Sequence, residues 1–113
     1  MRYLLLICSD ERSYENMSPE EGAARMAAWG QYTQDLTAAG KNLGGERLRP
    51  VASATTVRLK DGDRLLSDGP FAETKEQLGG FFMIEAENLD EAIDWASKMP
   101  HMAYGGSTEV RPI

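Results

Sequence analysis

Two continuous apolar runs stand out along the chain, at residues 3–8 and residues 79–84, and the second lies in a strand predicted over residues 80–86. Runs of this length without polar interruption are typical of strands buried on both faces, which lie at the centre of a sheet. Side chains alternate between the two faces of a strand. Phe81 and Met83 would therefore project to one face, and Phe82 and Ile84 to the other. The pattern therefore predicts two central strands with two apolar faces each.

Apolar residues spaced by three and four positions predict a long helix over residues 19–39. Ser18 is suited to the N-cap, Pro19 to the first helical position and Glu21 to the third, which together form a capping box. Gly40 is a common left-handed terminator of a helix. The side predicted to face the core comprises Ala23, Met26, Trp29, Tyr32 or Thr33, and Leu36.

A second helix is predicted over residues 89–99 by the same reasoning. Asn88 would be its N-cap, with Glu91 three residues further on, and Pro100 would end it. The predicted core-facing residues are Leu89, Ala92, Ile93, Ala96 and Met99.

The middle of the chain alternates more weakly between apolar and polar residues. Residues 54–59 are β-branched and alternating, and an Asp61-Gly62 turn leads back into residues 64–67, so a hairpin is predicted. Residues 42–53 contain Gly44, Gly45 and Pro50, a composition typical of an irregular, exposed and mobile connection that could include a short extended piece. Residues 107–111 predict a short polar edge strand.

The order of these elements is strand, helix, strand with hairpin, strand, helix, strand. This βαββαβ order predicts one α+β domain over residues 1–113, with a ferredoxin-like antiparallel sheet and an extra hairpin. The two apolar strands would be central, and the more polar strands at residues 54–59 and 107–111 would be edges. Two helices can cover only one sheet face, so Leu4, Leu6 and alternate residues of 81–84 would need cover from a second copy.

Composition and charge narrow the class of protein. The 113 residues carry 12 basic and 18 acidic side chains, a net charge of −6, with no basic cluster, which argues against direct binding to nucleic acid. The apolar run at the N-terminus is too short for a signal sequence or a membrane span, so we expect a cytoplasmic protein. Cys8 is the single cysteine and is interpreted as a small buried hydrophobe rather than a nucleophile.

The sequence DGPFAETKEQLGGFF at residues 68–82 contains a stiff turn followed by the second apolar run. Asp68 could accept hydrogen bonds from following backbone N–H groups, Gly69 is free in φ, and Pro70 fixes φ. This stretch resembles the signature of the DGPF branch of the YCII-related domain family. The resemblance implies a ferredoxin-like fold that pairs into a dimeric α+β barrel.

Two residues are candidates for acid/base chemistry. Asp68, in its rigid turn, could act as a general base if it were partly desolvated, or could only shape the turn. His101 is the single histidine and could move protons, with Tyr104 nearby, or could lie near a helix end without a catalytic role. In the better-studied YCII branch a His and Asp pair is proposed as catalytic, but this chain has no histidine in its N-terminal half.

Further candidates for ligand binding are Phe71, Lys75, Phe81 and Tyr104. One cysteine and one histidine cannot form a zinc site within one chain, and no phosphate loop, dinucleotide motif or G-x-S-x-G motif occurs, so no metal or cofactor is expected. A member of the similar family dehydrochlorinates a hydroxylated aromatic ring. The first hypothesis is therefore a homodimer that binds a small, aromatic ligand, with lyase or isomerase chemistry.

The alternative is a non-catalytic accessory or regulatory protein. Members of the resembling family are often encoded beside extracytoplasmic-function sigma factors or fused to them, which implies a partner in that pathway.

Overall fold

The computed structural model describes all 113 residues and has the mixed α+β architecture expected from the sequence. The main strands and helices follow the order β1 (Arg2–Ser9), α1 (Pro19–Ala38), β2 (Asn42–Arg47), β3 (Thr55–Lys60), β4 (Asp63–Asp68), β5 (Gln77–Glu85), α2 (Leu89–Ser97) and β6 (Ser107–Pro112). Three short 3₁₀ helices, η1 (Glu11–Tyr14), η2 (Val51–Ser53) and η3 (Pro100–Tyr104), lie in the connections. Neither α-helix has the length and apolar character needed to span a lipid bilayer.

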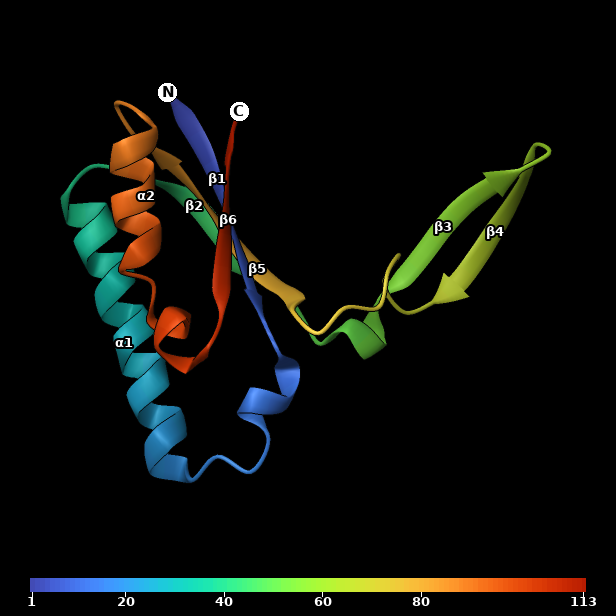
Figure 1. Cartoon of the computed structure of the whole chain (residues 1–113), viewed down its shortest axis with the longest axis horizontal. Helices are drawn as coiled ribbons and strands as arrows, with labels where there is room; N and C mark the ends of the chain where they lie inside the picture. The colour runs from blue at the N-terminus through green and yellow to red at the C-terminus, as the bar shows by residue number, and fades with distance from the viewer.

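Four strands form an antiparallel sheet in the order β2-β5-β1-β6, which is the ferredoxin-like arrangement. The apolar strands β1 and β5 are central, as predicted, and Leu4 pairs with Met83 and Leu6 with Phe81. Both helices lie on the same side of this sheet (Figure 1). The prediction of a ferredoxin-like α+β fold is confirmed.

Strand β2 is an edge strand of the sheet. Residues 42–53 were predicted as an irregular connection that could include a short extended piece, whereas residues 42–47 form a regular sheet strand. Glycine is unusual inside a strand, but Gly45 sits where the two backbones come very close. A Cβ atom at Gly45 would lie 2.4 Å from the carbonyl oxygen of Phe81. Gly44, at φ 130°, accompanies a register shift between Asn42 and Gly44. The glycines therefore mark a bulged, closely paired edge strand.

The hairpin predicted at residues 54–67 is present, but it is not part of the four-stranded sheet. Strands β3 and β4 pair only with each other, joined by Asp61 and Gly62, both at positive φ as a type I′ turn requires. Figure 1 shows this hairpin projecting away from the body of the molecule. We call residues 55–68 the arm. The prediction that residues 54–59 form an edge strand of the sheet was therefore wrong, because β2 already occupies that edge.

The core lies between the two helices and the covered face of the sheet. Its nine buried apolar side chains are Tyr3, Leu5, Tyr32, Leu36, Ile84, Ala86, Ala92, Ala96 and Met99. Trp29 and Phe82 stack at its margin, with ring centroids 6.3 Å apart. Residues 81–84 of β5 alternate between the two faces of the sheet. Phe82 and Ile84 face the helices, and Phe81 and Met83 face away.

Helix α1 begins and ends where the sequence predicted. The Ser18 side chain accepts a hydrogen bond from the Glu21 N–H, and Gly40 ends the helix at φ 73°. The predicted core position of Met26 was wrong, since this side chain is 71% exposed. The first half of α1 extends beyond α2 (Figure 1), and there Arg25 faces the molecule, with its guanidinium over the ring of Tyr104.

Helix α2 is also capped as predicted, with the Asn88 side chain accepting from the Glu91 N–H. Its buried residues are Ala92 and Ala96, and Met99 just beyond its end is buried too. Leu89 and Ile93 were expected in the core but are about half exposed. Small residues line the contact because α2 packs closely on the sheet, which leaves the larger side chains at its margins.

The close approach at Gly45 gives a test of the β2 assignment. Replacing Gly45 by Ala should lower the free energy of unfolding by about 1–3 kcal/mol, because a methyl group must displace the β5 backbone. Gly30→Ala is the matched control. Gly30 lies in α1 with no atom within 4 Å of an added Cβ, so alanine should stabilise there by about 0.5–1 kcal/mol. Urea denaturation measures both, and a neutral Gly45→Ala variant would contradict the pairing.

Candidate functional site

The sheet face opposite the helices carries a strip of apolar side chains. Leu4 and Leu6 of β1 lie beside Met83 and Phe81 of β5, and all four are only partly buried. Cys8 follows on the same face of β1. We call the surface formed by these five side chains the open face. Both helices lie on the other side of the sheet (Figure 1), so no helix covers the open face within one chain.

A shallow groove of about 410 Å³ lies at one end of the open face. It is formed where the end of β1, the start of β6 and the segment before β5 meet, and its lining residues are Cys8, Thr74, Lys75, Glu76, Ser107, Thr108 and Glu109. We call it the end groove. Its charged side chains are one ammonium group and two carboxylates, and its size is within the range of small-molecule sites.

The thiol of Cys8 lies between these carboxylates. Partial burial, together with the negative charges of Glu76 and Glu109, raises the pKa of Cys8. The thiol therefore remains protonated at neutral pH, which agrees with the interpretation of Cys8 as other than a nucleophile. Cys8 was interpreted as a buried small hydrophobe, and the structure shows it only partly buried, on the open face.

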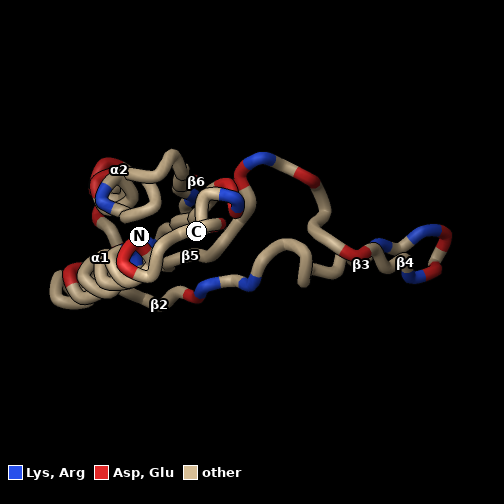
Figure 2. The backbone as a smooth tube through the Cα atoms, turned by 90° about the horizontal axis from the view of Figure 1, so that it is seen from below, with Lys and Arg blue, Asp and Glu red and all other residues tan.

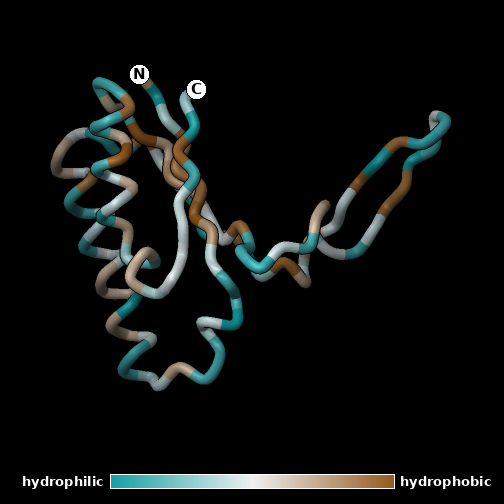
Figure 3. Tube along the Cα trace, in the orientation of Figure 1, coloured by the Kyte–Doolittle hydropathy of each residue, from teal (hydrophilic) through white to brown (hydrophobic).

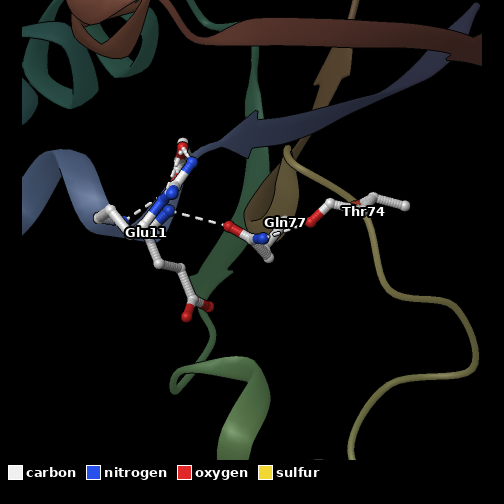
Figure 4. A network of polar contacts seen from close by, with 5 residues as sticks. Glu11, Thr74 and Gln77 are labelled. Atoms are coloured by element: carbon white, nitrogen blue, oxygen red, sulfur yellow. Dashed lines mark hydrogen bonds and ion pairs between the residues drawn. The ribbon is translucent and has the colours of Figure 1, made fainter.

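The loop that leads to the end groove is held by a polar network (Figure 4). The Gln77 side chain accepts a hydrogen bond from the Glu11 N–H at 2.8 Å and donates one to the Thr74 carbonyl oxygen. The Glu11 carboxylate in turn accepts from the Val51 N–H at 2.9 Å. The start of η1, η2 and the loop before β5 are thus joined through the side chains of Glu11 and Gln77. A second groove of about 360 Å³, lined by Val51, Ala52, Gly69, Pro70, Glu73, Thr74 and Gln77, lies on the other side of this loop.

Asp68 is the last residue of the arm and is exposed. Its side chain makes no hydrogen bond to the following backbone, contrary to expectation. The turn is instead closed by the Gly69 N–H, which donates to the Ala54 carbonyl oxygen at 2.7 Å, with Gly69 at φ 96°. Phe71, just beyond, is 81% exposed. The position of Asp68 is therefore fixed by the pairing of β3 with β4 and by the Gly69–Ala54 hydrogen bond, and not by a hydrogen bond of its own carboxylate.

His101 lies in η3 and is 1% exposed. Its ring stacks on Trp29, with centroids 5.5 Å apart and an interplanar angle of 17°. The Nε2 atom is 2.8 Å from the Ser107 carbonyl oxygen and 3.1 Å from Thr108 Oγ1. Since a carbonyl oxygen only accepts, Nε2 carries the proton and the buried Nδ1 has no partner. Burial accordingly lowers the pKa of His101.

The structure does not join Asp68 and His101 within one chain. No hydrogen bond, ion pair or groove links them, and the arm points away from the helices that cover His101 (Figure 1). His101 nevertheless contacts Ser107 and Thr108, which line the end groove from behind. His101 thus holds Ser107 and Thr108, two residues of the groove wall, through these contacts.

Tyr104 is part of a different cluster. The Arg25 guanidinium lies 3.8 Å from the centroid of the Tyr104 ring and 5.3 Å from that of Tyr14. Arg25 also donates to the Ser13 carbonyl oxygen at 3.3 Å. This cation–π contact fastens η1 and η3 to the first half of α1 and places the Tyr104 ring away from the end groove.

Of the residues proposed from the sequence, Lys75 lines the end groove and Phe81 lies on the adjoining open face. Cys8, Glu76 and Glu109 were not proposed as site residues. They come from three distant parts of the sequence, and only the strand register brings them together: Cys8 lies opposite Ser107, and Leu6 opposite Glu109.

Comparison with known proteins agrees with this fold. The YCII-related domain model matches residues 1–113, and the chain therefore belongs to the YCII-related family. It is 40% identical over 114 residues to "Uncharacterized protein R00369" of Rhizobium meliloti (strain 1021), covering 100% of this chain and 92% of that protein.

Among solved structures, the chain is similar to 5-chloro-2-hydroxyhydroquinone dehydrochlorinase (TftG) from Burkholderia phenoliruptrix AC1100, in complex with 2,5-dihydroxybenzoquinone. The TM-score is 0.53 at 22% sequence identity, over 100% of this chain and 93% of that one. At this identity the likeness establishes the shared fold.

The buried imidazole predicts a dependence of stability on pH. His101 has a lowered pKa in the folded protein, so the unfolded chain binds more protons as the pH falls below about 6.5. The free energy of unfolding should therefore decrease between pH 7 and pH 5, and His101→Gln should show a flatter dependence over that window. Asp10, whose pKa is lowered by Arg12, contributes only at more acidic pH.

Chemical denaturation at one fixed protein concentration measures this dependence. Because His101 is the single histidine, the imidazole NMR signals report its protonation directly. An imidazole that titrates at or above pH 6.5 would contradict its burial against Trp29.

Proposed function

We propose that this protein, a member of the DGPF branch of its family, binds a small hydroxylated aromatic ligand in the end groove of a homodimer. The observation that carries the proposal is the position of the end groove: a charged recess directly continues an apolar strip. An aromatic ring would lie on the strip near Phe81, while its hydroxyl groups would reach the charged side chains of Lys75 and Glu76. The quinone named with the solved relative has this combination of a flat ring and polar oxygens.

Proton transfer of the lyase or isomerase type fits these side chains. The raised pKa of Cys8 disfavours a thiolate nucleophile, whereas the carboxylates of Glu76 and Glu109 can accept protons and Lys75 can stabilise an oxyanion. Asp68, proposed as a general base, could reach such a ligand only from a second copy. His101 would act on the ligand indirectly, by fixing the backbone of Ser107 behind it.

Association of two copies is supported by the surface of the single chain. Its accessible area is 7839 Å², whereas a compact monomer of 12.5 kDa would expose about 6,200 Å². The excess is about 1,600 Å², and a stable interface buries roughly 800 Å² on each partner. Pairing of two open faces across a twofold axis would cover the apolar strip and close the end groove at its mouth.

The dimer is tested by Phe81→Asp. A charge on the open face forfeits about 1.5 kcal/mol or more of apolar burial in each copy, so the dimer Kd should rise about 100-fold or more. Met26→Asp makes the same kind of change on the outer side of α1 and should leave the dimer unchanged. Light scattering and thermal melts over a hundredfold dilution measure association. A wild-type protein that stays monomeric throughout would contradict the proposal.

Ligand binding is tested with 2,5-dihydroxybenzoquinone as the probe, by calorimetry and thermal shift. Lys75→Ala should raise the Kd about 10-fold, which corresponds to the loss of one hydrogen bond to a charged group. Lys98→Ala, which removes an ammonium group lying over Trp95, is the control and should bind like the wild type. Release of chloride from 5-chloro-2-hydroxyhydroquinone tests turnover. Equal binding by both variants, or no binding by the wild type, would contradict this assignment of the groove.

A further inference from the structure

The arm has no structural support within its own chain. An isolated two-stranded hairpin is at best marginally stable in water, yet β3 and β4 pair only with each other. The arm extends the molecule to 49 Å in its longest dimension, and the radius of gyration is 16.0 Å where a compact chain of this length would have about 13 Å. The arm therefore requires a contact that a single chain does not provide.

The two faces of the arm differ in their apolar content, with three exposed apolar side chains on one face and only Leu65 on the other. One face is tied to the base of the arm, where the Arg58 guanidinium donates to the Phe71 carbonyl oxygen and Thr56 Oγ1 donates to that of Gly69. The other face carries Val57, Leu59 and Leu66, which are 59%, 76% and 59% exposed. Cross-strand pairing of Val57 with Leu66, next to Leu59, makes these side chains one continuous patch. Figure 3 shows hydrophobic segments in the arm as well as in the central strands.

Charge favours one occupant of this patch. The arm itself is balanced, with three basic and three acidic residues, and its approach at residues 47–54 adds two basic residues and no acidic one. Residues 47–68 therefore carry a net charge of +2, from five basic and three acidic residues, and the rest of the chain carries −8, from seven basic and fifteen acidic ones. Figure 2 shows both signs of charge along the arm and acidic residues on the body. An arm with a basic approach that points away from its own acidic body is complementary to the body of another copy of the same chain.

We propose that the arm is a clasp that packs its Val57, Leu59 and Leu66 face against a second copy of this chain. The contact extends the proposed pairing of open faces and rests on the association of two copies, not on the identity of the ligand. Asp68 pairs with Thr55 at the base of the same face of the arm. The clasp therefore places this carboxylate at the junction between the two copies.

Photo-crosslinking tests the clasp directly. A photoreactive phenylalanine analogue is placed at position 59, on the apolar face, or at position 65, on the opposite face, and ¹⁵N-labelled and unlabelled chains are mixed before irradiation. Position 59 should give crosslinked peptides that join a labelled to an unlabelled chain, and position 65 should give several-fold fewer. Crosslinks from position 59 that stay within one chain, or none at all, would overturn the clasp.

Substitutions give the second measurement. Leu59→Ser with Leu66→Ser should raise the dimer Kd at least tenfold, and Leu65→Ser, the control, by less than threefold. The arm lies outside the core, so near-UV circular dichroism should remain unchanged. Equal Kd values for the two variants would overturn the clasp.

The clasp and the open-face dimer fail in distinguishable ways. If Phe81→Asp dissociates the dimer while the arm variants leave it intact, the clasp is wrong and the open-face dimer stands. Backbone amides of the arm that exchange hydrogen freely in an intact dimer would likewise overturn the clasp alone. A wild-type protein that shows no association over the dilution series would overturn both.

Discussion

Two helices cover one face of a sheet whose central strands are apolar on both faces, and most features of this molecule follow from that imbalance. The covered face holds nine buried apolar side chains, a small core for 113 residues. The opposite face offers Leu4, Leu6, Phe81 and Met83 to solvent in an isolated chain. Burial of apolar area is the main favourable contribution to folding, so a chain that leaves half of its sheet unused is poorly stabilised alone.

The covered face also determines the shape of the candidate site. His101 fills the space between Trp29 and the start of β6, and its Nε2–H fixes the Ser107 carbonyl oxygen. Gly106 makes this possible, because a Cβ there would lie 2.6 Å from the imidazole ring. The wall of the end groove on the open face is thus held from the core side. In this position the imidazole supports the groove wall through its contacts with Ser107 and Thr108.

The sequence predicts those parts of the fold that depend on local chemistry. Long apolar runs identified β1 and β5, and side-chain caps at Ser18 and Asn88 identified both helix starts. The place of β2 in the sheet was not predicted because Gly44 and Gly45 also suit a loop. Only the approach of the Phe81 carbonyl oxygen shows why Gly45 is needed. Likewise, the spacing of apolar residues could not show that Arg25, rather than Met26, faces the molecule. That orientation depends on η1 and η3, which pack against the first half of α1. The groove depends on strand register, which local patterns do not specify.

The arm, like the open face, is apolar surface without cover in a single chain. Residues 55–68 contain well-formed turn chemistry and alternating β-branched residues, so the hairpin forms from local preferences, but nothing local determines where it packs. Its apolar face consists of three residues and ends at Arg64, which lies opposite Leu59, and a charged residue at this place limits indiscriminate strand pairing. The basic approach to the arm is opposite in charge to the acidic body, which favours the body of another copy over a basic surface. Thus the apolar face of the sheet makes association favourable, and the arm with its basic approach adds selectivity.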